Sequence, residues 1–254
     1  MSETQTPRPW ASNTTLDQIA AWLRRSRRTV VLTHVKPDGD AIGSTLALAR
    51  ALNYAAGSLA ASLGPIAVPW YFGPLPDWFP EVAGPTERRI ITEDQRAEHD
   101  DREEPDAIVV LDTGAWTQLH DVREWLLDRT AKTAVIDHHQ QGDPEVGARL
   151  VIDTRAAAAC ELATGLCVAI LGLSGPRELP VDVATPLYLG LATDTGWFRH
   201  SNVSPSNARA AMPIFRRRRR SKHCLIVFGR CSHSRHRKES GFRRFVSPRM
   251  RLRK

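Results

Sequence analysis

The residue types that could do chemistry gather at the ends of apolar runs, and the densest group is Asp137, His138 and His139. These polar side chains directly follow the apolar run 133–136, which is typical of a buried strand. Polar groups at such a point cost free energy unless they are solvated, paired or coordinated. The triplet therefore indicates either a solvent-facing turn or part of a metal site, depending on whether other segments supply further ligands.

Other segments do supply further candidate ligands near the ends of their own apolar runs. These are His34, Asp38, Asp40, Asp112 and Asp194. An aspartate after a strand is commonly a helix N-cap or turn residue, so each one alone has an ordinary structural explanation. As a set they are harder to explain by capping, because clustered carboxylates repel one another unless a cation neutralises them.

The donor types restrict the metal and the reaction. No cysteine belongs to the set, which argues against a thiolate zinc site or an iron–sulfur cluster. Carboxylates together with imidazoles suit Mn²⁺, with Mg²⁺, Co²⁺ or Fe²⁺ as alternatives. The number of ligands is sufficient for two ions that share a bridging carboxylate. Such a centre activates water for attack on phosphorus, so phosphoester hydrolysis is the favoured chemistry.

Alternating strands and helices are needed to position these residues. We expect strands at 28–34, 65–72, 106–112, 133–137 and 148–153, and helices at 14–26, 40–57, 122–131, 156–173 and 182–194. Thr14 or Thr15 is the expected N-cap of the first helix, and Gly57 is the expected end of the second. The sequence predicts an α/β fold with a mainly parallel sheet flanked by helices, whose carboxyl edge is where such sheets bind ligands.

Composition fits a globular protein of one large domain or two small ones, since 42% of the 254 residues are hydrophobic and 25% charged. No apolar run is long enough for a membrane span, and four scattered cysteines form no disulfide framework, so we expect a cytoplasmic protein. The net charge of +7 is unevenly distributed. Residues 213–254 contain 16 basic residues and one acid, a net of +15, so residues 1–212 carry −8.

Four motifs resemble those of the DHH phosphoesterase superfamily. They are "THVKPDGDAIGS", "VVLDTG", "VIDHHQ" and "LATDTGWFRHS", in this order. The resemblance covers roughly residues 15–212, and the chain looks most like the RecJ-like branch that has a DHH domain and a DHHA1 domain. It implies a Mn²⁺-dependent phosphoesterase of the exoribonuclease type. The implied substrates are short oligoribonucleotides and 3′-phosphoadenosine 5′-phosphate.

The resemblance also implies a role for each residue. One metal would be bound by His34, Asp38 and Asp112, and a second by Asp40, Asp112, His138 and Asp194. Asp112 would thus bridge the two ions. Asp137 and His139 are the implied catalytic pair. Asp137 would orient His138, and His139 would face the substrate phosphate or the leaving oxygen. The alternatives are that Asp137 only caps and that His139 only packs.

Smaller features near these motifs also have two interpretations. Gly39 and Gly43 would let the backbone approach closely beside the metals. Ser44 would either cap a helix or contact phosphate. The Trp-rich segment 68–79 could stack on a base, although burial of its aromatic side chains against the sheet is the favoured interpretation.

The resemblance breaks near Pro213, because the glycine-rich "GGGH"-like motif and the phosphate-gripping arginine of the DHHA1 domain are not found. We therefore expect a flexible leader at 1–15, the DHH domain at 16–212 and a disordered basic tail at 213–254. The tail is either an arm that binds RNA phosphates or the product of a shifted reading frame. Alternative functions are a cyclic-dinucleotide phosphodiesterase and an inactive nucleic-acid-binding remnant. No membrane partner is expected, and a homodimer is left open.

Overall fold

The structure is a computed structural model that describes residues 8–57, 60, 62, 64, 66–91 and 104–199. It confirms an α/β fold built on a six-stranded sheet of order β3-β2-β1-β4-β5-β6, in which every pair of neighbours is parallel. The strands are β1 Thr29–Leu32, β2 Ala67–Phe72, β3 Arg89–Ile91, β4 Ala107–Leu111, β5 Thr133–Asp137 and β6 Arg149–Ile152. The sequence analysis missed β3, which has only three residues.

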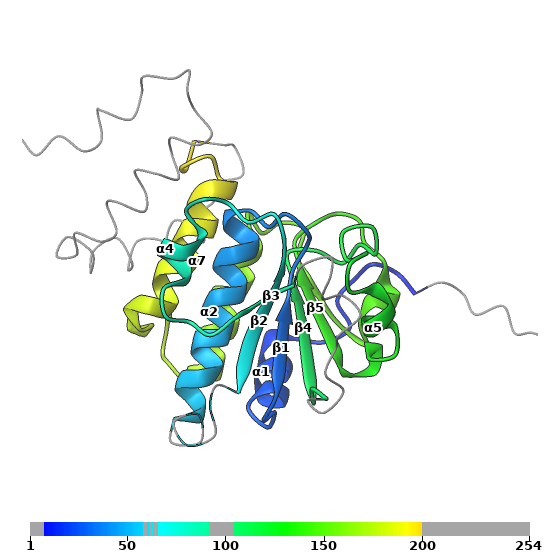
Figure 1. The fold of residues 1–254 in the computed structure, drawn as a ribbon, viewed down its shortest axis with the longest axis horizontal. Coiled ribbons are helices and arrows are strands. Elements are labelled where there is room, and N and C mark those ends of the chain that lie inside the picture. Colours follow the sequence, from blue (N-terminus) through cyan, green and yellow to red (C-terminus); the bar gives the residue numbers. More distant parts are fainter. Residues whose placement is uncertain are drawn as a thin grey trace, which may run out of the picture. The chain divides into compact units, whose positions relative to one another are not determined.

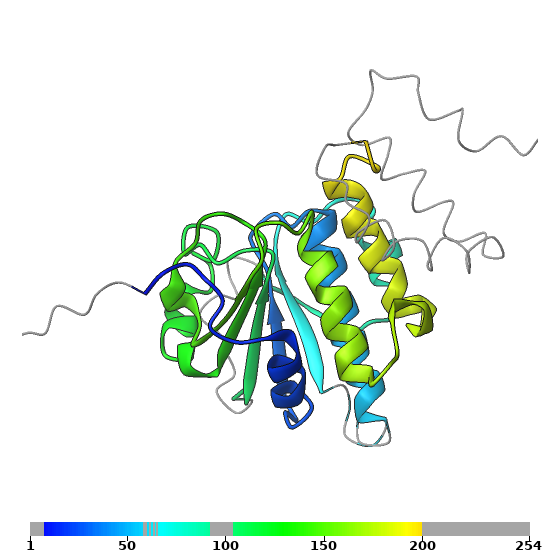
Figure 2. The same ribbon diagram turned by 180° about the vertical axis from the view of Figure 1, so that it is seen from behind.

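The helices lie on both faces of this sheet. They are α1 Leu16–Leu23, α2 Gly39–Ala56, α4 Phe79–Ala83, α5 Arg123–Leu127, α6 Ala159–Leu171 and α7 Val181–Asp194, with short 3₁₀ turns at Thr130–Lys132, Pro144–Val146 and Pro176–Glu178. Figure 1 shows α2 and α7 on one side of the sheet and α5 on the other, and Figure 2 shows α6 beside α2. None of the helices in the described part of the chain is long and apolar enough to cross a bilayer.

Local sequence signals explain where these elements begin and end. The hydroxyl of Thr15 accepts from the backbone amide of Gln18, whose side chain in turn accepts from the amide of Thr15, so α1 starts with a capping box. Gly57 ends α2 with a positive φ of 50°. Strands β4 and β5 are buried along their whole length, as expected for a parallel sheet covered on both faces.

The Trp-rich segment 68–79, which includes most of β2, contributes mainly to the core. Phe72 and Trp78 are buried, so the prediction of burial is confirmed for these two side chains. Trp70 is only half-buried, and its ring packs against that of Trp125 with 5.1 Å between the centroids. Trp125 belongs to α5, so this contact helps to hold α5 against the sheet.

Residues 8–13, which we call the N-terminal strap, are attached to the edge of the sheet. The backbone amide of Asn13 donates to the carbonyl of Leu150 at 3.0 Å, and the Asn13 side chain accepts from the Leu150 amide at 2.8 Å. The hydroxyl of Ser12 accepts from the amide of Ile152 at 2.7 Å. This part of the expected flexible leader is therefore ordered, because β6 is an edge strand whose backbone groups need partners.

Several expectations fall on residues outside the described ranges. These are residues 1–7 of the leader, residues 200–212 of the expected DHH domain, and the basic tail at 213–254. The nature of the tail, including the choice between an RNA-binding arm and a shifted reading frame, stays a prediction.

Helices α2, α6 and α7 pack closely through glycine. A Cβ atom at Gly43 of α2 would overlap the carbonyl oxygen of Pro186 in α7, and would lie 3.0 Å from the sulfur of Cys160 in α6. A backbone oxygen cannot move aside cheaply, so only glycine fits at this crossing. The expected role of Gly43, a close approach of backbones, is confirmed.

We predict that Gly43→Ala lowers the free energy of unfolding by about 1–3 kcal/mol through overpacking, measured by chemical denaturation. Gly165→Ala in α6 is the matched control. Its Cβ would meet only the mobile end of Leu16 at 3.2 Å, and alanine favours a helix. Equal stability of the two variants would contradict the close-packing explanation.

A second prediction concerns the turn between α1 and β1, which Asp106 holds. Its carboxylate accepts from the Ser26 hydroxyl and from the backbone amides of Arg27 and Arg28 at 3.0 and 2.9 Å. Burial alone would raise the pKa of Asp106, but these hydrogen bonds outweigh it and lower the pKa below its usual value.

Asp106→Asn should therefore destabilise the protein at pH 7 by about 0.5–1.5 kcal/mol, since the carboxylate is exposed and solvent screens it. Because the folded pKa lies below the unfolded value of about 3.9, the carboxylate stabilises the fold above that pH and ceases to do so as the pH falls through the folded value. The difference in Tm between wild type and variant should thus shrink below about pH 4. A difference that stays constant down to pH 3 would be inconsistent with this account. Asp17→Asn, at an exposed position, controls for the loss of one charge.

Candidate metal centre

The candidate ligands meet at the carboxyl ends of three adjacent strands. His34 lies two residues after β1, Asp112 directly follows β4, and Asp137 ends β5 just before His138 and His139. Strands β1, β4 and β5 are neighbours in the sheet, so their ends deliver these side chains to one place. The N-terminus of α2 adds Asp38 and Asp40, and the last residue of α7 is Asp194.

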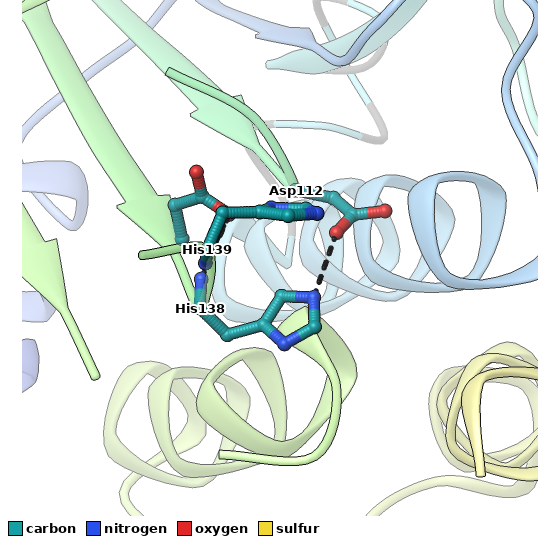
Figure 3. Close-up of side chains that lie close together, drawn as sticks. Asp112, His138 and His139 are labelled. Carbon is teal, nitrogen blue, oxygen red and sulfur yellow. Dashed lines mark hydrogen bonds and ion pairs between the residues drawn. The ribbon is translucent and has the colours of Figure 1, made fainter. Parts of the chain in front are cut away.

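Asp112 lies between two imidazoles. Its Oδ1 is 3.3 Å from Nε2 of His138, and its Oδ2 is 3.6 Å from Nε2 of His34, so each oxygen faces one histidine. Figure 3 shows the first of these contacts, with the ring of His139 beside that of His138 at 4.5 Å between the centroids. The Asp112 side chain is almost fully buried, and its backbone has a positive φ of 63°, which is uncommon for a residue other than glycine.

The candidate ligands form three overlapping groups, and in each group the ligand atoms lie within 4.8 Å of one another. The first set is His34, Asp38 and Asp112, and the second is Asp40, His138 and Asp194. A third group consists of Asp112, Asp137, His138 and His139. The structure thus brings the six expected metal ligands close together, and the assignment of each to a particular ion stays a prediction.

Two of the aspartates also act as helix caps. Oδ1 of Asp38 accepts from the amides of Asp40 and Ala41 at 2.9 and 3.2 Å, which caps α2. Asp40 receives the amides of Ala159 and Cys160 at 2.6 and 2.9 Å, and these are the first two residues of α6. The sequence analysis treated helix capping and metal binding as alternative roles for such aspartates. A carboxylate has about four lone-pair sites, so the geometry leaves room for both.

Backbone carbonyls fix the tautomers of the two inner histidines. Nδ1 of His34 lies 2.9 Å from the carbonyl of Val35, and Nδ1 of His138 lies 3.2 Å from that of Ala156. A carbonyl can only accept, so Nδ1 carries a proton in each ring. In the neutral imidazole, Nε2 is then the nitrogen available to bind a metal, and it is the nitrogen that faces Asp112.

Asp137 does not orient His138, contrary to expectation. Its Oδ1 lies 2.7 Å from Nδ1 of His139 and accepts from the backbone amides of His138 and His139 at 2.7 and 3.3 Å. In extended backbone, residues two apart share a side, so Asp137 reaches the ring of His139 rather than that of its immediate neighbour. Oδ2 of Asp137 is buried and has no hydrogen-bond partner within the described part of the chain.

The electrostatics of the cluster fit a site that is completed by a cation. Burial raises the pKa of Asp194 to about 6, and burial together with the carboxylates of Asp112 and Asp194 raises that of Asp40. Burial alone would lower the pKa of His34 and His138, but hydrogen bonds to Asp112 raise both to about 9. Protons thus compensate the clustered charge, and a divalent cation bound by these oxygen and nitrogen donors could take over that role.

Other residues near the centre support its backbone. A Cβ at Gly39 would overlap the side chain of Thr193, so glycine lets the start of α2 approach the end of α7 beside Asp194. The Ser44 hydroxyl donates to the carbonyl of Asp40 at 2.8 Å and is buried, so it neither caps a helix start nor faces the site.

The sequence analysis missed Trp10, whose indole contacts the loops after β4 and β5. The indole packs on Gly114 and Gly142, and nothing in the sequence around these two glycines indicates that Trp10 contacts them.

Comparisons with known proteins agree with this arrangement. Residues 28–191 match the DHH family, N-terminal domain. Over 189 residues, the chain is 32% identical to the bifunctional oligoribonuclease and PAP phosphatase NrnA of Thermus thermophilus, which covers 72% of this chain and 48% of that protein. The chain therefore spans about half the length of this relative.

A solved structure shows the same fold. The crystal structure of an exopolyphosphatase-related protein from Bacteroides fragilis superposes with a TM-score of 0.69 and 22% identity, over 88% of this chain and 61% of that chain. At this identity the similarity concerns the fold alone. The family match is different, because it extends over more than half of the sequence and contains the strand ends that carry His34, Asp112 and Asp137. This protein therefore belongs to the DHH family and contains its N-terminal domain.

Proposed function

We propose that the chain is a metal-dependent phosphoesterase whose two metal ions share Asp112. The observation that carries the proposal is the position of this buried carboxylate, which has one imidazole facing each oxygen and forms a set with His34 and Asp38 beside the set of Asp40, His138 and Asp194. His34, Asp38 and Asp112 would hold one ion, and Asp40, Asp112, His138 and Asp194 the other. The mixture of carboxylates and imidazoles supports Mn²⁺, with Mg²⁺ or Co²⁺ as alternatives.

When bound, such a pair of ions supplies an activated water and stabilises charge on the phosphoryl oxygens. Asp137 and His139 complete the proposed catalytic machinery. The hydrogen bond from Nδ1 of His139 to Asp137 raises the pKa of His139 and fixes its ring, so that Nε2 can deliver a proton to the leaving oxygen. About half of the His139 side chain is exposed, which leaves it accessible to a substrate.

The proposed substrates are short oligoribonucleotides and 3′-phosphoadenosine 5′-phosphate. This choice is supported by the similarity to the Thermus thermophilus relative, a bifunctional oligoribonuclease and PAP phosphatase. The chain matches 48% of that protein, so these substrates are a proposal for this chain. The cytoplasmic location, a homodimer and the alternative functions stay predictions.

Asp112→Asn should lower Mn²⁺ affinity by about 100-fold and reduce the number of ions bound, because it weakens the ligand that the two proposed ions share. Isothermal titration of metal-stripped protein measures both quantities. Asp17→Asn, which removes an exposed carboxylate from α1, is the matched control and should bind as wild type does. Wild-type affinity in Asp112→Asn would refute the shared-ligand arrangement.

With Mn²⁺, the wild-type chain should release mononucleotides from RNA of two to five nucleotides and phosphate from 3′-phosphoadenosine 5′-phosphate. His139→Ala should lower kcat by about 10²–10⁴-fold, since it removes a proton donor, and leave Mn²⁺ affinity within a few fold. His120→Ala, at an exposed histidine, is the control. No hydrolysis of either substrate by wild type would contradict the proposal, and lost metal affinity in His139→Ala would make His139 a ligand instead.

A further inference from the structure

The indole of Trp10 lies directly on two glycines that belong to the loops of the candidate centre. A Cβ at Gly142 would lie 2.5 to 2.7 Å from ring atoms Cζ2, Cη2 and Cε2 of Trp10. A Cβ at Gly114 would overlap Cη2 of the same ring. Neither glycine has a positive φ, so the space that the indole occupies, rather than backbone conformation, is what excludes a side chain at both positions.

The same indole makes a hydrogen bond next to the catalytic pair. Its Nε1–H donates to the backbone carbonyl of His139 at 3.0 Å. Gly114 lies two residues after Asp112, and Gly142 lies three residues after His139. One side chain from the N-terminal strap therefore contacts the loop that carries the proposed bridging carboxylate and the loop that carries the proposed proton donor.

The two loops are also joined directly, and the strap is anchored outside them. The amide of Asp143 donates to the carbonyl of Gly114 at 2.8 Å, and its carboxylate accepts from the amide of Trp116 at 2.8 Å. The guanidinium of Arg8 donates to the carbonyl of Pro144 at 2.6 Å, on one side of Trp10. Together with the attachment of the strap to β6, this contact holds the indole in place from both directions.

We infer that Trp10 is a positioning residue that sets the separation of the Asp112 and His139 loops and thereby aims the His139 imidazole. This inference rests on the proposed function, since it assigns a role within the same site. A residue that merely anchored the chain terminus to the core would affect stability but neither loop motion near His139 nor kcat. Misplacement of a reacting group by about 1 Å can cost about 10²-fold in rate, so a clamp at this point has a measurable consequence.

The test compares Trp10→Ala and Trp10→Phe with Trp22→Phe. Trp22 stacks under Arg149 and serves as the matched aromatic control. Hydrogen exchange in residues 112–116 and 137–143 should become at least about 10-fold faster in Trp10→Ala. With the proposed substrates, kcat should fall about 10–100-fold while KM changes less than about 3-fold. Trp10→Phe loses the N–H donor and part of the ring, and should be intermediate.

A double-mutant cycle isolates the contact itself. Gly142→Ala in the wild-type background should reproduce the effects of Trp10→Ala, because the added methyl group displaces the indole. In the Trp10→Ala background the same methyl group has free space, so Gly142→Ala should cause no further loss. Strong coupling of this kind is expected for residues in contact, whereas the effects of distant, independent residues add.

The two measurements separate the failure of this inference from the failure of the proposed function. Unchanged hydrogen exchange in both loops, or an unchanged kcat in an active enzyme, would overturn the positioning role of Trp10. If wild type hydrolyses neither substrate, the proposed function fails. The role of Trp10 is then still decided by hydrogen exchange, because Gly142→Ala should speed exchange in the wild-type background and cause no further increase in the Trp10→Ala background.

Discussion

The structure depends on how the negative charge of Asp112 is neutralised in a buried position. A lone carboxylate there would be costly, and the fold surrounds it with two imidazoles instead of a lysine or arginine. Imidazole differs from those cations because it can lose its proton and become a ligand. The same geometry can therefore balance charge with protons or with metal ions. The strained backbone at Asp112 is consistent with a position that is set by the site rather than by the strand.

The neighbouring helices are tied to this arrangement. Asp40 is held by the amides at the start of α6, and that start lies against α2 and α7 at points where only glycine fits. A Cβ at Gly190 of α7 would meet the Asp40 carboxylate at 2.8 Å. The packing of these helices and the positions of the candidate ligands therefore depend on each other. A shift of α7 away from α2 would move Asp194 and loosen the contacts around Asp40 together.

Much of this was predictable, because the chemistry follows from where parallel strands end. The strand ends after β1, β4 and β5 were visible as apolar runs that stop at His34, Asp112 and Asp137, and parallel order then brings them together. The partner of Asp137 was predicted wrongly, since the choice between two adjacent histidines depends on the local backbone rather than on the motif.

Contacts between distant segments could not be read from the sequence. Trp10 lies in a stretch with no helix or strand periodicity, so nothing indicated that it would meet Gly114 and Gly142. The strap that carries it is ordered by hydrogen bonds to an edge strand, which requires knowing that β6 is the edge. The short strand β3 was missed for a related reason, because three residues give too weak a pattern.

The double use of Asp40 has a consequence for how the family can change over evolutionary time. A metal ligand that has no structural role can be substituted once selection for catalysis is lost. Asp40 is not, because its loss would leave two amide groups at the start of α6 without their acceptor in a fully buried place. A descendant that had lost its activity should therefore still keep an acid at this position. The presence of Asp40 in a sequence is evidence for the fold, and the evidence for catalysis has to come from its less constrained neighbours.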